Sequence, residues 1–543
     1  MDGLMERCIA AVLIACFFVA ASGKLVAALQ QCGYGNRRFL KWYFKSENAF
    51  HSRFAYWAFL SAFATYGLAL SFSFLKGSLP LVVSSIPFFF FAILFFIADK
   101  SYAFKVPCVR SGRLKRLTAA YFAFTALVAF VVISLCSFLG GLLAAKNLPE
   151  WVVLGRYIPV SFLPLFLPWT LCLTNLVEGT FEKLRNARYI KRAGQVLDES
   201  KIIKIGVVGS YGKTTVKTLL TGLLSVKYSV LASPLSYNTP IGVAKTVDLF
   251  KAQGAEVLVM EFGARKLGDI EELCELVKPQ TVVFTGVCAQ HLETFGGEET
   301  VLKAKCECLG SVATTAVCGE GLRERIENAD FLSESEKKKC VYADLQTLVK
   351  DVVYFAEKTC FTLCLDGEEI AVEVPLLGRA AVENIALAAK AASVLGLTGE
   401  EIEKGLRQVK PIPHRLELKK EKGVFILDDA YNANEKGAAK AIEALCRFEG
   451  KKYLVTPGII ETGVMSKKIN ENLGALIANA NLDGVALVGG AQVKAVKDGY
   501  LNAGGDETKL SLSSTLEKAV GCVSSLLEKG DAILFLNDLP DAY

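Results

Sequence analysis

Long apolar stretches alternate with short charged segments along the first third of the chain. These stretches are 8–23, 54–75, 78–98, 117–145 and 157–177. A bilayer core about 30 Å thick requires roughly twenty apolar residues per helix, so four of the stretches are long enough to span a membrane and the first is marginal. The pattern predicts an all-α membrane bundle of about five helices over residues 1–180.

Basic residues are concentrated in the loops that follow the first, third and fifth stretches. Loops rich in Lys and Arg stay on the cytoplasmic side, so we predict a multi-pass protein of the cell (inner) membrane with everything after about Glu178 in the cytoplasm. The middles of the stretches contain no Asp, Glu, Lys or Arg, which favours an anchor or lipid-facing platform over an ion-driven transporter. The first stretch is also compatible with a cleaved signal peptide, because it ends in small residues at 19–23.

After residue 202 the pattern changes to short apolar runs rich in β-branched residues, separated by segments with helical spacing. Continuous apolar runs of this kind are typical of strands in a parallel sheet that helices cover on both faces. The runs lie at 202–208, 255–261, 281–287, 424–430, 451–458, 484–490 and 532–538. Two further runs flank Asp366-Gly367 within 352–374 and predict a β-hairpin.

The second part of the chain is therefore predicted to be an α/β body of two domains. A charged segment over 181–201 forms a linker, 202–410 form a central domain and 411–543 form a C-terminal domain. Pro411 and Pro413 mark a hinge between the two domains.

Composition and charge exclude several functions. With 52% hydrophobic and 21% charged residues, the chain is too apolar to be wholly soluble or disordered. A net charge of +6 over 543 residues is too small to indicate a nucleic-acid partner. The 16 cysteines lack the spacing of a zinc site, and three histidines are too few for a His-rich metal site.

A glycine-rich segment, GSYGKTT, connects the first strand of the α/β body to a predicted helix. Glycines let backbone N–H groups turn toward an anion, the helix N-terminus adds a partial positive charge, and Lys213 can reach the outer phosphates of a nucleotide. Thr214 can offer its hydroxyl group to Mg²⁺. The usual motif has a further glycine where this chain has Val207, so a structural glycine turn remains the alternative. The predicted phosphate-binding residues are Gly209, Ser210, Gly212, Lys213, Thr214 and Thr215.

Two further predicted strands lead to residues that can bind a metal. Glu261 is the last residue of its run, and His291 follows the next run. Because the carboxyl ends of parallel strands meet at one edge of a sheet, Glu261 is a candidate magnesium ligand beside the phosphate loop. Each residue taken alone also has a simpler interpretation, namely a capping or surface acid and a structural histidine.

The order of these motifs resembles the Mur ligase family. The similar segments are GSYGKTT (209–215), SYNTPIG (236–242), MEFGARKLGDI (260–270), HLETFGGEETVLKAK (291–305), GR (378–379) with Asn384, RLE (415–417) and DDAYNAN (428–434). The likeness covers roughly two-thirds of the chain, from about residue 202 to the C-terminus. It implies an α/β fold with a Mur-ligase-type P-loop central domain, whose sheet is mostly parallel, and a Rossmann-like C-terminal domain, here preceded by the membrane bundle.

The resemblance implies an ATP-dependent ligase. In this family ATP phosphorylates a carboxylate, an amine attacks the acyl phosphate, and an amide, ADP and phosphate result. By analogy, Thr214 and Glu261 hold one Mg²⁺. His291 and Lys305 serve a second one, with Lys305 carbamylated so that it offers oxygen ligands. Two cations and preorganised positive charge lower the barrier to phosphoryl transfer.

Further residues acquire roles from the same resemblance. Lys213 stabilises charge on the γ-phosphoryl oxygens. Arg415 and Asp429 come from the C-terminal domain and touch phosphate and ribose or metal-bound water after the domains close. Asn384 lies on the adenine side. His414, although next to Arg415, is interpreted as structural or solvent-exposed.

Several positions depart from the family pattern. Ala380 and Ala381 stand where His-Asn is common, which leaves Asn384 as the polar residue on the adenine side. Ala430, the segment 457–463, Asn470 and the segment 536–538 also differ from the family. The C-terminal differences lie where the incoming amine usually binds. The family's UDP-sugar-binding domain is missing, and the membrane bundle stands in its place.

These departures leave three hypotheses. In the first, the acid is a carboxylate-bearing peptide or glycopeptide precursor of peptidoglycan, lipid-linked or otherwise near the membrane, and the amine is an amino acid or dipeptide. In the second, a polyglutamate-type ligase lengthens an amino-acid polymer. In the third, a catalytically silent membrane scaffold binds nucleotide, which the presence of all four expected metal ligands disfavours. No nucleic-acid partner is expected.

Overall fold

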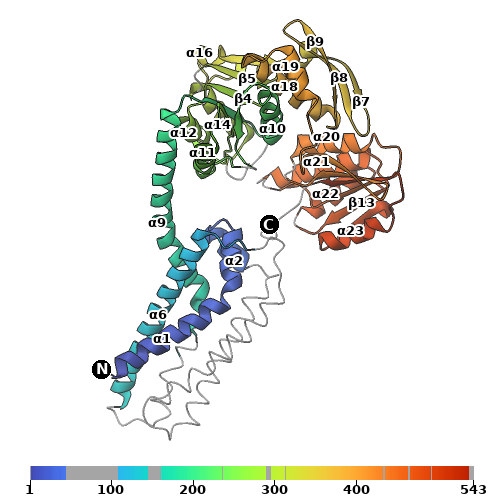
Figure 1. The fold of residues 1–543 in the computed structure, drawn as a ribbon. Coiled ribbons are helices and arrows are strands. Elements are labelled where there is room, and N and C mark those ends of the chain that lie inside the picture. Colours follow the sequence, from blue (N-terminus) through green and yellow to red (C-terminus); the bar gives the residue numbers. More distant parts are fainter. Residues whose placement is uncertain are drawn as a thin grey trace. The chain divides into compact units, whose positions relative to one another are not determined.

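The computed structural model describes residues 2–44, 108–144, 159, 162–234, 237–288, 295–311, 314–431, 434–460, 462, 465–490 and 492–536. The chain divides into two compact units, Met1–Arg185 and Asn186–Leu539. Figure 1 shows helices in the first unit and alternating helices and strands in the second. The predicted α/β body that follows a helical region is thereby confirmed.

The described part of the first unit is helical. Its helices are α1 (Asp2–Ala21), α2 (Gly23–Gln31), α3 (Asn36–Tyr43), α6 (Gly112–Ala144) and the first half of α9 (Leu163–Glu199). α1 packs along α6, and their common core contains Phe18, Leu117 and Tyr121. Ser22, at the junction of α1 and α2, donates to Phe18 O at 2.6 Å and lies 3.1 Å from the Tyr121 hydroxyl.

Some helices of this unit have the length and composition of membrane spans. α6 meets that criterion by itself over Gly112–Leu142, whereas α1 and α2 meet it only together, because the chain bends by 53° between them. Buried helices of soluble proteins and signal sequences meet the same criterion. The predicted stretch 117–145 coincides with α6 and the stretch 8–23 with α1, while 54–75 and 78–98 lie outside the described residues.

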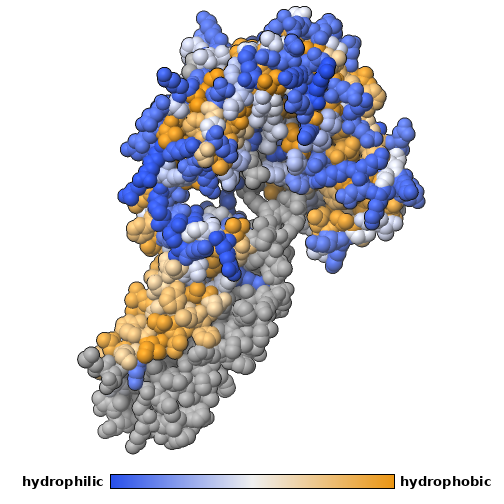
Figure 2. All heavy atoms as spheres, viewed as in Figure 1, coloured by the Kyte–Doolittle hydropathy of each residue, from blue (hydrophilic) through white to orange (hydrophobic). Residues whose placement is uncertain are grey.

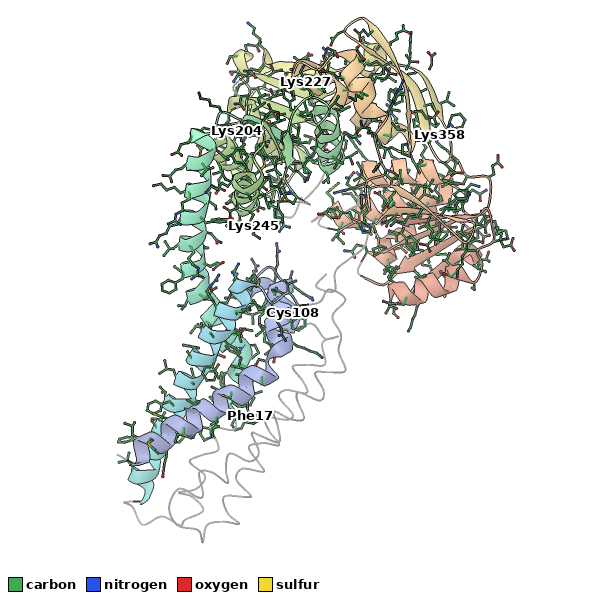
Figure 3. The ribbon with its side chains drawn as sticks, viewed as in Figure 1. Phe17, Cys108, Lys204, Lys227, Lys245 and Lys358 are labelled. Atoms are coloured by element: carbon green, nitrogen blue, oxygen red, sulfur yellow. The ribbon has the colours of Figure 1, made fainter. Side chains whose placement is uncertain are left out.

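α9 runs without interruption from the predicted fifth stretch through the predicted linker, so 181–199 are helical. Its second half belongs to the second unit, where Ala193 and Leu197 enter the core of the central domain. Lys204 of strand β1 (Ile203–Val208) is labelled near the end of α9 in Figure 3. Its Nζ donates to Leu197 O at 3.2 Å. The charges that suggested a linker lie on the exposed side of this docked helix.

The described strands of the central domain form a parallel sheet in the order β2-β3-β1-β4-β5-β6. Besides β1 they are β2 (Val230–Ala232), β3 (Val257–Glu261), β4 (Thr281–Phe284), β5 (Thr315–Gly319) and β6 (Cys340–Ala343). The surrounding helices include α10 (Lys213–Leu224), α11 (Pro240–Gln253), α12 (Asp269–Val277), α14 (Glu298–Ser311) and α18 (Gly378–Val394). Along β3, Leu258 and Met260 enter one core while Val257 and Val259 enter the other. Burial on both faces explains the continuous apolar run.

A separate antiparallel sheet is inserted before α18. It consists of β7 (Val349–Tyr354), β8 (Thr359–Leu365) and β9 (Glu368–Val374). Asp366 and Gly367 form the β8–β9 turn with φ of +51° and +89°, which confirms the predicted hairpin. β7 is an additional strand that the sequence pattern did not separate from the hairpin.

The C-terminal domain has a mixed sheet in the order β10-β11-β15-β12-β13-β14. Its strands are β10 (Glu417–Glu421), β11 (Val424–Asp429), β12 (Lys452–Thr456), β13 (Gly484–Val488), β14 (Leu510–Ser513) and β15 (Ala532–Leu536). β10 pairs antiparallel with β11, whereas the other described pairs are parallel. The Rossmann-like expectation therefore needs a correction: β10, whose sequence ELKKE lacks an apolar run, adds an antiparallel edge strand.

Two helices of this domain approach one another at glycines. They are α21 (Ser466–Asn479) and α22 (Val493–Asn502). A Cβ atom on Gly474 would lie 2.1 Å from Val496 O, and one on Gly499 would lie 2.0 Å from Glu471 O. The two helix backbones can pack at this distance only because neither position carries a side chain.

Replacing Gly474 by Ala should lower the free energy of unfolding by about 1–3 kcal/mol, the usual cost of overpacking, despite the better helix propensity of Ala. The matched control is Gly521→Ala in α23 (Leu516–Ser524), where an added Cβ meets no atom within 4 Å. It should stabilise by about 0.5–1 kcal/mol. Apparent melting temperatures of the full-length variants test both expectations, and equal shifts in the two variants would contradict the packing argument.

Candidate active site

The segment after β1 forms a tight loop that only glycine permits at two positions. Gly209 has φ +146° and Gly212 has φ +74°. A Cβ on Gly209 would lie 2.0 Å from Thr285 Oγ1, and one on Gly212 would lie 2.7 Å from Asn384 Oδ1. Gly212 is the N-cap of α10 and provides no side-chain cap, so the first N–H groups of α10 have no capping side chain to compete with an anion.

The Glu261 side chain is 97% buried at the carboxyl end of β3 and gathers partners from several segments. Its Oε2 accepts from Thr214 Oγ1 at 2.9 Å, and its Oε1 accepts from Asn238 Nδ2 at 3.3 Å. Lys217 Nζ lies 3.4 Å from Oε2 and also donates to Ser233 O at 2.9 Å. The carboxylate therefore holds the phosphate loop, α10 and the segment before α11 together.

Two lysines of α10 face this carboxylate from successive turns. Burial lowers the pKa of both Lys213 and Lys217, and the negative charge of Glu261 opposes that shift. Lys213 Nζ also lies 3.4 Å from Ser210 O within the loop. Their four-residue spacing places both ammonium groups on one face of the helix.

Lys305 extends from α14 into the same region and is only 3% exposed. Burial, together with the nearby Lys213 ammonium, lowers the pKa of Lys305 to about 7. Two residues further along α14, Glu307 accepts hydrogen bonds from Gly268 N at 2.7 Å and Ile270 N at 3.2 Å. Glu307 thus fixes α14 against the N-terminus of α12 and with it the position of Lys305.

The C-terminal domain contributes Arg415 and Asp429. Arg415 Nη2 donates to Thr214 Oγ1 at 3.2 Å, and its guanidinium lies 4.2 Å from the centre of the Tyr431 ring. Asp429 Oδ1 accepts from Leu416 N at 3.1 Å. Burial raises the pKa of Asp429 to about 6, although Arg415 favours its charged form.

Helix α20 (Glu435–Leu445) makes a second connection between the two domains. Lys440 pairs with Glu383 of α18, which also accepts from Arg379 Nε at 3.1 Å. The ammonium groups of Lys436 and Lys440 lie 5.9 and 5.8 Å from the centre of the Tyr211 ring in the phosphate loop. These contacts hold α20 over the loop.

These groups surround one cavity of about 540 Å³. The predicted site residues that line it are Ser210, Gly212, Lys213, Thr214, Thr215, Glu261, Lys305, Asn384, Arg415 and Asp429. Gly209 lies in the loop directly before Ser210, and His291 is outside the described residues. The structure therefore brings together, from both domains, every predicted site residue that it describes.

Other lining or supporting residues were not predicted as site residues. They are Tyr211, Asn238, Asp269, Glu383, Tyr431, Lys436 and Lys440, which line the cavity, and Lys217, which supports it. Lys217 was detectable from its four-residue spacing from Lys213. The cavity residues of α18 and α20 carry no such signal, because they become neighbours only when the two domains pack.

Comparisons with known proteins agree on one family. The model of the Mur ligase middle domain matches residues 207–392, within the second unit. The UDP-N-acetylmuramoyl-tripeptide–D-alanyl-D-alanine ligase of Bacillus subtilis (strain 168) is 30% identical over 369 residues, 66% of this chain and 77% of the relative. The ligase of the same name from Escherichia coli (strain K12) is 28% identical over 294 residues, 52% of this chain and 64% of the relative.

Solved structures show the same relationship. The MurF ligase from Thermotoga maritima in complex with ADP is 29% identical, with a TM-score of 0.57 over 65% of this chain and 80% of that one. The folylpolyglutamate synthase from Mycobacterium tuberculosis complexed with ADP and AMPPCP shares the fold at 17% identity. Its TM-score is 0.53 over 66% of this chain and 94% of that one.

Lys305 should produce a pH dependence whose sign follows from its lowered pKa. The unfolded chain keeps this proton up to about pH 10.5, whereas the folded chain releases it near pH 7. Unfolding between these values takes up a proton, so the free energy of unfolding rises with pH in that window and the cost of burying the charge is complete below pH 7. Lys305→Met removes this cost. In CO₂-free buffer its melting temperature should exceed that of the wild type most at pH 6 and less at pH 9.

Lys303→Met is the matched control, because Lys303 lies on the exposed side of the same helix. Its melting temperature should stay close to that of the wild type, as is usual for an exposed side chain. A Lys305→Met difference that stays constant from pH 6 to pH 9 would show that the buried amine does not titrate in this range.

Proposed function

Because the chain belongs to the Mur ligase family, we propose that it joins an amine to the peptide carboxylate of a peptidoglycan precursor next to a membrane. As a member of this family it is an ATP-dependent ligase that forms amide bonds. The observation that carries the proposal is the cavity in which the phosphate loop, Glu261, Lys305 and Arg415 converge.

The proposed reaction assembles the triphosphate, the acid and the departing phosphate in one place. A carboxylate oxygen attacks the γ-phosphorus of ATP, the bond to ADP breaks, and an acyl phosphate forms. The amine nitrogen then attacks the acyl carbon, phosphate leaves, and the nitrogen loses a proton. Lys213 and Arg415 supply positive charge around the transferred group, and their partial removal from water strengthens that interaction.

The oxygen atoms near the phosphate loop fit a magnesium ion. Thr214 Oγ1 and Glu261 Oε2 lie 2.9 Å apart. Hydroxyl and carboxylate oxygens are ligands that Mg²⁺ takes in proteins. We therefore infer that these two residues hold Mg²⁺, which would neutralise negative charge on the β- and γ-phosphates. Lys217 balances part of the Glu261 charge beside this site.

Lys305 fits the proposed carbamate. Only a neutral amine reacts with CO₂, and a pKa of about 7 makes a large neutral fraction available near physiological pH. The carbamate would turn a repelling ammonium into an oxygen ligand for a second cation. His291 remains the predicted second ligand of that cation.

The base and amine subsites depart from the family pattern in different ways. Ala380, Ala381 and Asn384 all line the cavity, so a base placed there would meet two small apolar side chains and one amide. Asn470 is fully buried and bonds the backbone of Ile459 through both ends of its amide, at 2.8 and 2.9 Å. Asn470 thus organises the loop after β12, and the proposed amine remains an amino acid or dipeptide.

The proposed membrane location rests on the surface of the first unit. Leu127, Val131, Leu135 and Phe138 recur along α6 and are each more than half exposed. Figure 2 shows apolar side chains over the lower coloured part of this unit and hydrophilic ones at its upper end. A continuous apolar surface of this kind indicates contact with lipid or another apolar partner.

The charged end of the unit supports the proposed orientation. Arg37, Arg38 and Lys41 are exposed on α3, and the exposed rings of Phe44 and Trp169 lie 6.2 Å apart. Basic and aromatic residues concentrate at the headgroup level of the cytoplasmic leaflet. We infer a multi-pass anchor in the cell (inner) membrane, with the catalytic domains in the cytoplasm and the acid presented at the inner leaflet.

Lys305→Ala should reduce amide formation on the order of 100-fold, the scale observed when one electrostatic group of a transition state is removed. ATP affinity should change little, and added formate should restore part of the rate if it occupies the place of the carbamate. Lys303→Ala, on the exposed side of α14, is the control and should retain full activity. Unchanged amide formation in Lys305→Ala would exclude the proposed chemistry, and nucleotide binding without any amide formation by the wild type would select the scaffold hypothesis.

The acid can be identified by comparing acceptors with the full-length protein in nanodiscs. With ATP and candidate amines present, a lipid-linked peptide precursor should turn over at least tenfold faster than the same peptide on UDP, since only the former reaches the leaflet. Mass spectrometry of the products gives both rates. Equal turnover of the soluble acceptor would refute the membrane-proximal substrate, and release of phosphate with glutamate alone would select the polyglutamate-type alternative.

A further inference from the structure

Arg415 lies between two residues with left-handed backbone conformations. His414 has φ +57° and Leu416 has φ +51°. Residues other than glycine rarely adopt this backbone conformation, which persists where the surrounding structure holds it in place. The turn at 414–416 is therefore a place where the fold enforces a particular backbone path.

Three carboxylates hold this turn. His414 Nδ1 donates to Asp428 Oδ2 at 2.8 Å, and His414 N donates to Glu417 Oε2 at 3.1 Å. On the other side of Arg415, Leu416 N donates to Asp429 Oδ1 at 3.1 Å. The antiparallel register of β10 and β11 pairs Glu417 with Asp428 and so brings the acids to the turn.

The conformation of the turn at 414–416 determines where the Arg415 guanidinium lies. Its guanidinium reaches Thr214 Oγ1 at 3.2 Å and packs on the Tyr431 ring at 4.2 Å. Arg415 belongs to the C-terminal domain and Thr214 to the phosphate loop, so a small change of the backbone at 414–416 would move the guanidinium away from the loop. Displacements of about 1 Å in a catalytic group can cost on the order of 100-fold in rate.

A metal site is a poorer explanation of the same cluster. Ligand atoms of His414, Glu417 and Asp428 lie within 4.8 Å of one another. Lys419 Nζ, however, is 3.1 Å from Glu417 Oε2 and 2.7 Å from Asp428 Oδ2, so the cluster already contains its cation. Lys419 helps to orient Asp428 toward His414.

We propose that His414 and Asp428 are positioning residues for the ligase reaction: the hydrogen bond between them fixes the left-handed turn that directs Arg415 to the phosphate loop. The proposal rests on the proposed function only in assigning Arg415 to the reacting phosphate. It changes the interpretation of His414 from a merely structural or solvent-exposed residue to one that acts through Arg415.

Three substitutions distinguish the hydrogen bond of the His414 ring from the left-handed backbone conformation of that residue. His414→Gly keeps the left-handed conformation accessible but removes the bond to Asp428. His414→Asn also tolerates that conformation, and its Nδ2 occupies the place of the histidine Nδ1, so it can donate to Asp428. Lys422→Gly is the control, because Lys422 has φ +52° in the β10–β11 turn and lies outside the active site.

With the full-length protein, His414→Gly should lower kcat about tenfold or more with a smaller change in the KM for ATP. His414→Asn should restore most of the rate, and Lys422→Gly should match the wild type. In an Arg415→Lys background, His414→Gly should cause no further loss, because the group that it positions has been changed. Equal losses in both backgrounds, or no rescue by Asn, would overturn the proposal.

Amide formation by the wild type tests the proposed function, whereas the comparison of kcat between the variants tests the positioning role. If the wild type formed no amide, ATP affinity measured by calorimetry would replace kcat in the same comparison. A loss of affinity in His414→Gly that disappears in the Arg415→Lys background would still support the positioning role, and a loss that persists there would overturn it.

Discussion

The candidate site depends on the burial of one carboxylate. Glu261 is removed from water at the end of β3, and a buried charge is tolerated only when it is paired and hydrogen-bonded. Its partners are Thr214 and Lys217 of α10 and Asn238 of the segment before α11. Satisfying this charge therefore fixes the phosphate loop relative to α10 and α11. The hydrogen bond between Thr214 and Glu261 keeps a hydroxyl and a carboxylate oxygen side by side at the loop.

The second requirement is that the C-terminal domain completes the site. Arg415 reaches Thr214, and α20 contacts the phosphate loop and α18 through Lys436 and Lys440. Each of these contacts pairs a cation with an oxygen, a ring or a carboxylate, so positive charge is concentrated at the cavity. The same interface also contains apolar contacts, because Leu377 before α18 and Ala444 of α20 belong to one buried cluster.

The two halves of helix α9 carry different kinds of exposed side chain. Its first half exposes the large apolar side chains of Phe166, Trp169 and Leu173, whereas its second half carries charges outside and places Ala193 and Leu197 in the core of the central domain. The change from one pattern to the other occurs without a break in the helix. The charged segment therefore marks a change of surroundings and not the end of an element.

The sequence by itself determined much of the fold and of the central-domain site. Continuous apolar runs identified most of the buried strands, because a strand covered on both faces must be apolar at every position. GSYGKTT located the phosphate loop because only glycine fits its backbone at two positions. The sequence did not identify β2, β5, β6, β7, β10 or β14. Most of these strands are half-exposed, and the buried part of β5 is only three residues long, too short to stand out as an apolar run. It also could not reveal that His414 and Asp428 position Arg415, or that Lys440 reaches Glu383. Those contacts join residues that are distant in the chain or strained in conformation, and only the packing of the sheets and domains brings them within hydrogen-bonding distance.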